Sequence, residues 1–138
     1  MSLNIILSVI HLLAAVTGLG LITALALMAR KPGWANAQFM LQMFKIVVWS
    51  MVIMLVTGVG MLAATGWVFE QTWWFRISFL FFIALFAFHG IASGTLKKII
   101  ASGTPLPSSP MLGKLRTMTM LMCVALILIV VLMEGKPF

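Results

Sequence analysis

The chain has 138 residues, of which 63% are hydrophobic and only 8% are charged. A soluble domain is about half apolar and about a quarter charged, so these few charged side chains cannot cover a surface that faces water. The net charge is +7, but the basic residues are scattered between long apolar runs, which argues against a nucleic-acid-binding surface. One cysteine, Cys123, excludes a disulfide framework, and the absence of tyrosine excludes tyrosyl chemistry.

Four apolar segments reach the length of roughly 20 residues that an α-helix needs to cross a bilayer. We expect these helices at about residues 3–29, 44–64, 74–96 and 115–133. The connections between them are short, and short connections make neighbouring helices run antiparallel. The sequence therefore predicts an all-α membrane protein, a four-transmembrane-helix antiparallel bundle in which residues 1–138 form a single domain.

The third connection, residues 102–113, is the longest and contains three prolines. Its Ser, Pro and Gly content predicts an irregular and mobile loop without a regular element. The second connection is tight and carries Trp67, Trp73 and Trp74, which suit a membrane–water interface.

Most of the positive charge lies on one side of the predicted bundle. Seven of the nine basic residues lie in or beside the first and third connections: Arg30, Lys31, Lys45, Lys97, Lys98, Lys114 and Arg116. Positively charged connections face the cytoplasm. We therefore expect both termini on the non-cytoplasmic side.

Two histidines are expected at membrane depth, His11 in the first helix and His89 in the third. Ionisable residues there face the protein interior and are functional candidates by default, and imidazole is the commonest metal ligand. The alternative is a neutral histidine that bonds to a neighbouring helix. At 1.5 Å per residue, His11 lies roughly 12 Å and His89 roughly 22 Å from the outer ends of their helices. Two axial ligands of one haem iron lie only about 4 Å apart, so we expect separate roles for the two histidines.

Small residues accompany His11, because Ala14 and Gly18 lie on the same face of the first helix. They either let a neighbouring helix approach closely or leave space for a ring-shaped cofactor.

The twelve methionines offer thioether ligands for haem iron or Cu(I), although most methionines in such helices only fill space. No HExxH, P-loop, GxSxG or CxxC motif supports hydrolytic, nucleotide-driven or thiol-redox activity.

Residues around His11 resemble the first helix of the copper-resistance-protein-D-like family. In that family, glycine follows the histidine nine residues on, as Gly20 does here after the run Ala-Ala-Val-Thr-Gly-Leu of residues 14–19.

The third and fourth helices resemble the membrane-bound, haem-containing protoporphyrinogen oxidase family, which also has four helices. Trp74 and His89 match the spacing of that family's third helix, and Ser78 stands where the family has a lysine implicated in activity. The hydrophobic ending in Lys136-Pro137-Phe138 also resembles that family.

These resemblances imply a bacterial inner-membrane, multi-pass protein that binds haem b and has an electron-transfer or accessory role in a membrane redox system. The implied metal ligands are His11 and His89, of which His11 matches the family's haem-linked histidine. Arg76 would meet a haem propionate, or else pair with Glu70 or lipid phosphate. Ser78 and Gly18 complete the expected cofactor site.

Three alternatives stay open at this point. The first is a cofactor-free structural accessory subunit of a larger membrane complex. The others are copper handling and protoporphyrinogen oxidation, and only the latter would make the protein an enzyme, against which Ser78 in place of lysine argues. The expected partners are the lipid bilayer and other membrane subunits or further copies of the chain, not nucleic acid.

Reporter fusions test the predicted orientation. A reporter that folds only outside the cytoplasm should be active when it is fused after Phe138, because the positively charged connections hold the opposite side in the cytoplasm. The same reporter inserted within residues 102–113 should be inactive. The opposite pattern would contradict the orientation.

Overall fold

The computed structural model describes residues 2–135, and within this range it contains helices and connections but no strand. The four long helices are α1 (Leu3–Arg30), α2 (Ala37–Ala64), α3 (Trp73–Ala101) and α4 (Leu112–Gly135). Three short 3-10 helices lie in the connections, η1 (Pro32–Trp34), η2 (Val68–Gln71) and η3 (Leu106–Ser108). All four long helices are long and apolar enough, by length and composition, to cross a membrane, which fits the predicted four-helix membrane protein. The Lys136-Pro137-Phe138 ending lies outside the described residues.

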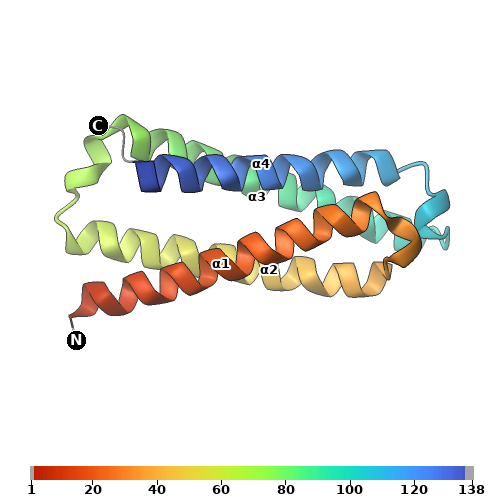
Figure 1. Ribbon diagram of the computed structural model, residues 1–138, viewed down its shortest axis with the longest axis horizontal. Helices are drawn as coiled ribbons and strands as arrows, with labels where there is room; N and C mark the ends of the chain where they lie inside the picture. Colours follow the sequence, from red (N-terminus) through yellow and green to blue (C-terminus); the bar gives the residue numbers. More distant parts are fainter. Residues whose placement is uncertain (1, 136–138) are drawn as a thin grey trace.

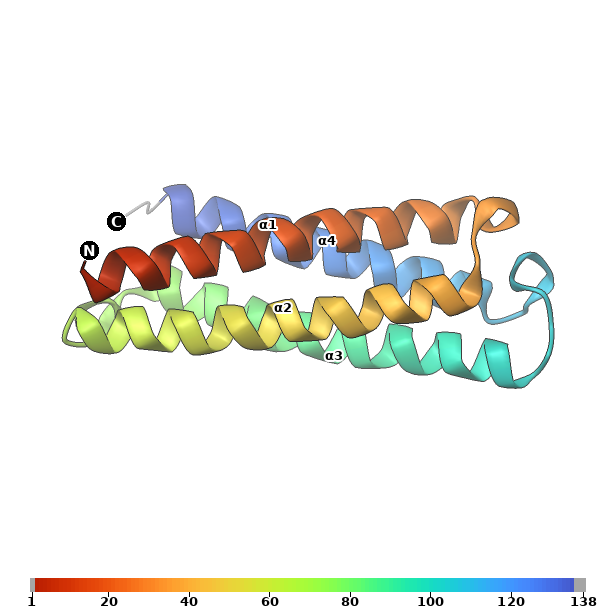
Figure 2. The same cartoon turned by 90° about the horizontal axis from the view of Figure 1, so that it is seen from below.

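The chain reverses its direction at each connection, so α1 begins and α4 ends at the same end of the bundle (Figure 1). We call this end, which also holds η2, the terminal end, and the opposite end, which holds η1 and η3, the basic end. The most extensive helix contacts are those of α1 with α2 and of α3 with α4, whereas α1 with α4 and α2 with α3 make fewer. The bundle is therefore two helical hairpins that lie side by side (Figures 1 and 2).

The core runs through the middle of the bundle, and large apolar side chains also cover the outside. Residues with no measurable exposure include Leu25, Met40, Val47, Met51, Leu85, Leu96, Leu115 and Met122. On the outside, Leu80 is 66% exposed and Val16 is 61% exposed. A surface of this kind suits lipid acyl chains, because helices in a bilayer satisfy their own backbone and can present apolar side chains outward.

Two helices are longer than their apolar segments. α2 begins at Ala37 rather than near residue 44, because the Asn36 side chain accepts hydrogen bonds from the backbone N–H groups of Gln38 and Phe39 at 2.9 and 3.2 Å. α3 continues to Ala101 rather than ending near residue 96. The Asn36 cap therefore decides where α2 begins, and hydropathy does not measure such a cap.

The third connection is more ordered than its sequence suggested. It contains η3, and the side chain of Leu106 is only 5% exposed and belongs to the hydrophobic core. The prediction of a loop without a regular element is therefore wrong at Leu106–Ser108. The reason is local: Pro105 and Pro107 pre-set the backbone on either side of an apolar residue that inserts beneath the loop.

Replacing Leu106 with alanine should destabilise the bundle by about 2 kcal/mol or more, because it removes buried apolar contacts and leaves a cavity. Leu12→Ala is the matched control, since Leu12 is 63% exposed on α1. Thermal unfolding in detergent should show a clear drop in midpoint for the first variant only. Equal midpoints for both variants would mean that the loop does not hold the basic end together.

Candidate functional site

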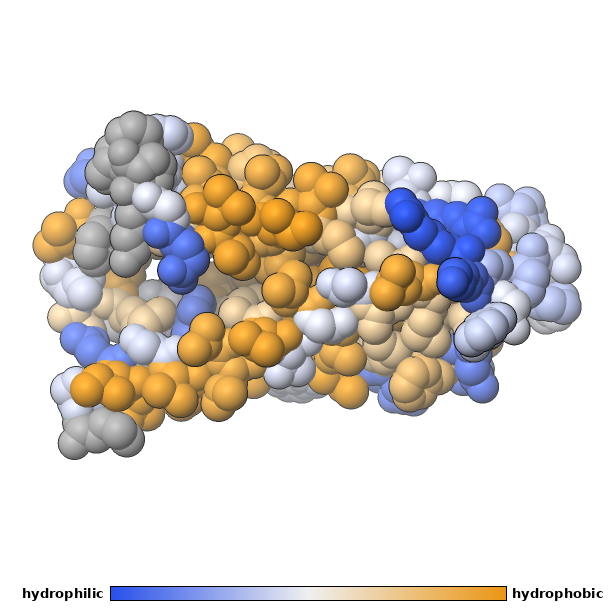
Figure 3. Space-filling view, in the orientation of Figure 1, coloured by the Kyte–Doolittle hydropathy of each residue, from blue (hydrophilic) through white to orange (hydrophobic). Residues whose placement is uncertain are grey.

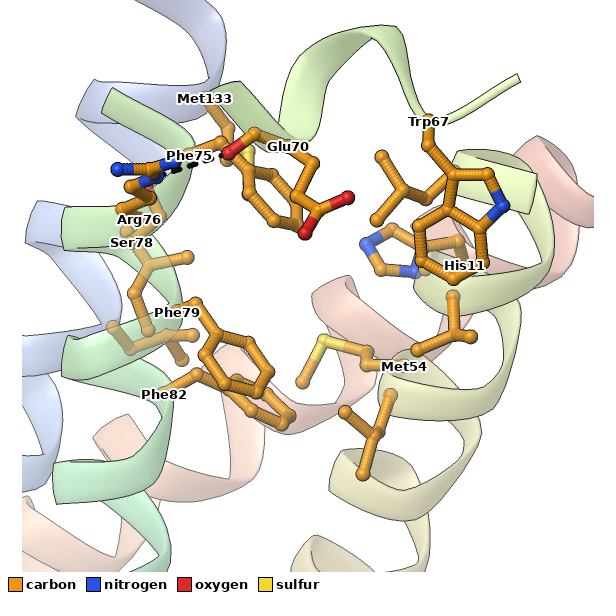
Figure 4. Close-up of a pocket in the computed structure, with 16 residues that line it drawn as sticks. His11, Met54, Trp67, Glu70, Phe75, Arg76, Ser78, Phe79, Phe82 and Met133 are labelled. Carbon is orange, nitrogen blue, oxygen red and sulfur yellow. Dashed lines mark hydrogen bonds between the residues drawn. The ribbon is translucent and has the colours of Figure 1, made fainter. Parts of the chain in front are cut away.

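A cavity of ≈ 630 Å³ lies between the four helices at the terminal end of the bundle (Figure 4). Its lining residues are His11, Met54, Leu55, Gly58, Val59, Leu62, Trp67, Glu70, Phe75, Arg76, Ser78, Phe79, Phe82, Leu126, Ile129 and Met133. This volume lies within the range of about 300–1,000 Å³ for small-molecule and cofactor sites. The walls are apolar, and few of the lining side chains are polar. The cavity suits a largely apolar molecule with a small polar part.

The protein surface is hollowed at this place. The space-filling view shows a recess between α1 and α4 at the terminal end (Figure 3). Apolar side chains surround much of the recess, and this face of the helices is one that lipid would touch in a membrane.

His11 is fixed by a hydrogen bond to α2. Its Nδ1 lies 2.8 Å from the Thr57 Oγ1, and that hydroxyl donates its own proton to the Ile53 backbone O at 2.7 Å. A hydroxyl has one proton, so toward His11 the Thr57 oxygen accepts and Nδ1 carries the donated hydrogen. Nε2 is then the unprotonated nitrogen of the neutral ring, and Figure 4 shows a ring nitrogen of His11 directed into the cavity.

Gly58, the residue after Thr57, also faces the imidazole. A Cβ at Gly58 would lie 3.4 Å from the His11 Cε1, which is an ordinary van der Waals contact. Thr57 gives His11 its hydrogen-bond partner, and Gly58 packs beside the ring.

The polar rim of the cavity comes from η2 and the beginning of α3. Arg76 donates from Nε to the Glu70 backbone O at 3.1 Å and from Nη2 to the Gln71 Oε1 at 3.0 Å, which ties η2 to α3. Figure 4 shows the Glu70 carboxylate extending into the cavity on the side of His11. Arg76 therefore meets Glu70 through its backbone, and the carboxylate stays directed into the cavity.

Ser78 lines the same cavity but is 1% exposed, and its hydroxyl donates to the Trp74 backbone O at 2.8 Å. Its proton is therefore already used within α3. Ser78 therefore gives the cavity neither a positive charge nor a free hydrogen-bond donor.

Trp67 reaches the cavity from a strained backbone. Gly66 and Trp67 both have positive φ, 68° and 62°, directly after α2 ends. Glycine adopts this region readily, whereas a bulky residue there is a genuine outlier. Such strain gathers at ligand sites, and here it holds the indole over the cavity.

The structure brings together three of the five expected site residues. His11, Arg76 and Ser78 line one cavity, whereas Gly18 and His89 do not. Gly18 lies in the contact between α1 and α2, where an added Cβ would be 3.8 Å from both Ser50 Cβ and Met54 Cε. It gives close helix packing rather than space for a cofactor.

His89 is buried in the other half of the bundle. Its Nε2 donates to the Phe44 backbone O at 2.8 Å, and the two rings pack edge to face at 5.5 Å. The α2 partners of the two histidines, Thr57 and Phe44, lie roughly 20 Å apart along the helix at 1.5 Å per residue. One haem iron therefore cannot bind both imidazoles, and His89 joins α3 to α2.

A multidentate metal centre is not visible in the described part of the chain, residues 2–135, where no three or more His, Cys, Asp or Glu side chains gather. The cavity nevertheless holds the thioethers of Met54 and Met133 in addition to the imidazole of His11. One imidazole with a thioether is a donor set that binds haem iron, whose other four ligands come from the porphyrin.

Searches found no match to this chain among protein-family models, curated proteins or solved structures.

Sequence reasoning did not place Thr57 or Trp67 in the site, and it offered Met54 only as one of twelve possible thioether ligands. A signal for Thr57 was present, because it lies about as far before the end of the second helix as His11 lies after the start of the first. In an antiparallel pair, these positions reach the same depth. For the positive φ of Trp67, the only indication in the sequence is the glycine that precedes it.

A double-mutant cycle with His11→Ala and Thr57→Val should give a coupling of about 0.6–2 kcal/mol, because hydrogen bonds between membrane helices contribute in this range. The measurement is unfolding of each variant and of the double variant in mixed micelles. Pairing His11→Ala with Thr95→Val is the control, since the Thr95 hydroxyl bonds only within α3, to the Ile91 O. A coupling near zero for the first pair would contradict the observed bond.

Proposed function

We propose that this protein binds haem b in the cavity, with His11 as a ligand of the iron, and serves electron transfer or an accessory role in a membrane redox system. The observation that carries the proposal is the 2.8 Å hydrogen bond between the His11 Nδ1 and the Thr57 Oγ1, which occupies one ring nitrogen and leaves Nε2 to a metal. Metal-binding histidines in proteins are oriented in this way by a partner at the other ring nitrogen.

The rest of the cavity supports the same ligand. The side chains of Phe79 and Phe82 would form an apolar wall against a porphyrin, and the thioether of Met54 or Met133 would be a further ligand of the iron. Arg76 donates hydrogen bonds from Nε and Nη2 to residues of η2. Its remaining N–H groups would be the donors for a propionate. When bound, the haem would supply a one-electron redox couple, and the protein would supply its ligands and an apolar environment.

The proposed role is electron transfer or assistance to a larger system rather than catalysis. Ser78 supports this choice. Its hydroxyl is bonded to the Trp74 O, and the position holds this serine rather than a positively charged lysine. In the proposed topology the termini lie on the non-cytoplasmic side of a bacterial inner membrane. The cavity would then face that side, where a redox partner would approach it.

Absorption spectroscopy tests haem binding. The protein purified after expression with ample haem should show a Soret band and a positive pyridine haemochrome test. His11→Ala should abolish both signals. His89→Ala should retain them, because its partner on α2 lies in the other half of the bundle. Colourless wild-type protein, or equal loss in the two variants, would overturn the proposal.

Thr57→Val gives a graded test of the same site. Loss of the partner of a metal-binding histidine costs about 10–100-fold in affinity, so haem titration of the apoprotein should show a weakening of this size. Thr95→Val should bind as the wild type does, since Thr95 is buried in α3 and does not line the cavity. If wild-type protein binds no haem but keeps its fold and copurifies with other membrane subunits, the structural accessory role replaces this proposal.

A further inference from the structure

Two arginines cross between α1 and α4 at the basic end of the bundle. Arg116, near the start of α4, donates from Nε to the Ala29 backbone O in the last turn of α1 at 2.8 Å. Arg30, the last residue of α1, brings Nη2 to 4.0 Å from the Met120 Sδ on α4. Each arginine thus reaches across to the other helix, and both guanidinium groups lie at the same seam.

Within residues 2–135, no carboxylate side chain neutralises this pair. The chain has two acidic residues, and both lie at the terminal end, Glu70 in η2 and Glu134 in the last turn of α4. Both arginines are exposed. A guanidinium has five N–H donors, and the bond from the Arg116 Nε to Ala29 leaves its two terminal nitrogens for an anion.

An apolar strip continues from the arginines toward the middle of the bundle. Residues three or four apart share a helix face, so Leu27 lies on the side of α1 near Arg30, and Met120, Val124 and Ile127 follow Arg116 along α4. Leu27 is 60% exposed and Ile127 is 53% exposed. Figure 3 shows the same change along this face, from a strongly hydrophilic patch over the end of α1 and α4 to apolar surface.

We infer that the arginine pair and the apolar strip form a binding site for an anionic phospholipid. The headgroup phosphate would accept hydrogen bonds from Arg30 and Arg116, and guanidinium pairs well with phosphate in a fixed geometry. The acyl chains would lie against the strip. Basic pockets between membrane helices bind anionic headgroups in this way. The bound lipid would join the hairpin of α1 and α2 to the hairpin of α3 and α4 at their seam.

The charge of the basic end alone also attracts anionic lipid, so the experiment compares two double variants that lose equal charge. R30Q/R116Q removes the pair at the seam, and the glutamine that replaces Arg116 retains an N–H₂ donor for the Ala29 O. K97Q/K98Q removes two exposed lysines from the same end, on α3. The full-length protein in a neutral detergent is titrated with short-chain phosphatidylglycerol, and the apparent dissociation constant is measured.

We expect R30Q/R116Q to weaken phosphatidylglycerol binding about tenfold or more, the loss of at least one charged hydrogen bond, and K97Q/K98Q to change it by less than about twofold. Phosphatidylcholine should not compete. Equal weakening in both double variants would overturn the site and leave only diffuse attraction. Competition by inorganic phosphate at similar concentrations would also overturn it, because the apolar strip would then contribute nothing.

The single variant Arg30→Gln keeps the test decisive if the double variant does not fold. Arg30 has only the 4.0 Å contact with Met120, so its replacement leaves the Arg116 bond to α1 intact. Weaker phosphatidylglycerol binding by folded Arg30→Gln supports the site, and unchanged binding overturns it. The result does not depend on haem, since the cavity lies at the opposite end.

Discussion

Within a bilayer, every polar group must find its partner inside the protein, because lipid offers none. In residues 2–135, each buried side-chain nitrogen or oxygen has such a partner. Most hydroxyls meet the requirement within their own helix, as Thr119 does with the Leu115 O. The two histidines cannot, so each reaches α2, one through Thr57 and the other through Phe44. The same requirement that orders the bundle therefore also fixes the ring of His11.

The two-hairpin arrangement explains where a cavity can exist. Helices within a hairpin are held by close contact, as at Gly18, whereas the hairpins meet each other less extensively. At the basic end, Leu106 from the third connection is buried and belongs to the hydrophobic core. At the terminal end the corresponding connection is η2, which Arg76 holds to α3 at the rim. The cavity that contains His11 lies between the hairpins at the terminal end.

The fold followed from the sequence because apolar length is a strong signal, and the four spans appear where it placed them. Helix ends did not follow, since Asn36 extends α2 by capping, which hydropathy does not measure. For the site, the sequence pointed to His11, Arg76 and Ser78, and these three line one cavity. Gly18 was misleading, because a small residue beside a histidine serves helix packing and cofactor space equally well in a sequence. The hydrogen bond between His11 and Thr57 depends on the register of α1 against α2. The sequence of one helix alone does not predict that register.

In a membrane, the recess between α1 and α4 would face lipid, and a hollow of that kind would not stay empty. Acyl tails would enter it, so a molecule that binds there exchanges with lipid rather than filling a void. Part of the apparent affinity of the ligand then comes from the free energy that the displaced acyl tails gain when they pack again in the bilayer. The dissociation constant of a ligand at this cavity therefore depends on detergent chain length and bilayer thickness. Dissociation constants measured in different detergents or lipids describe the displacement of different molecules.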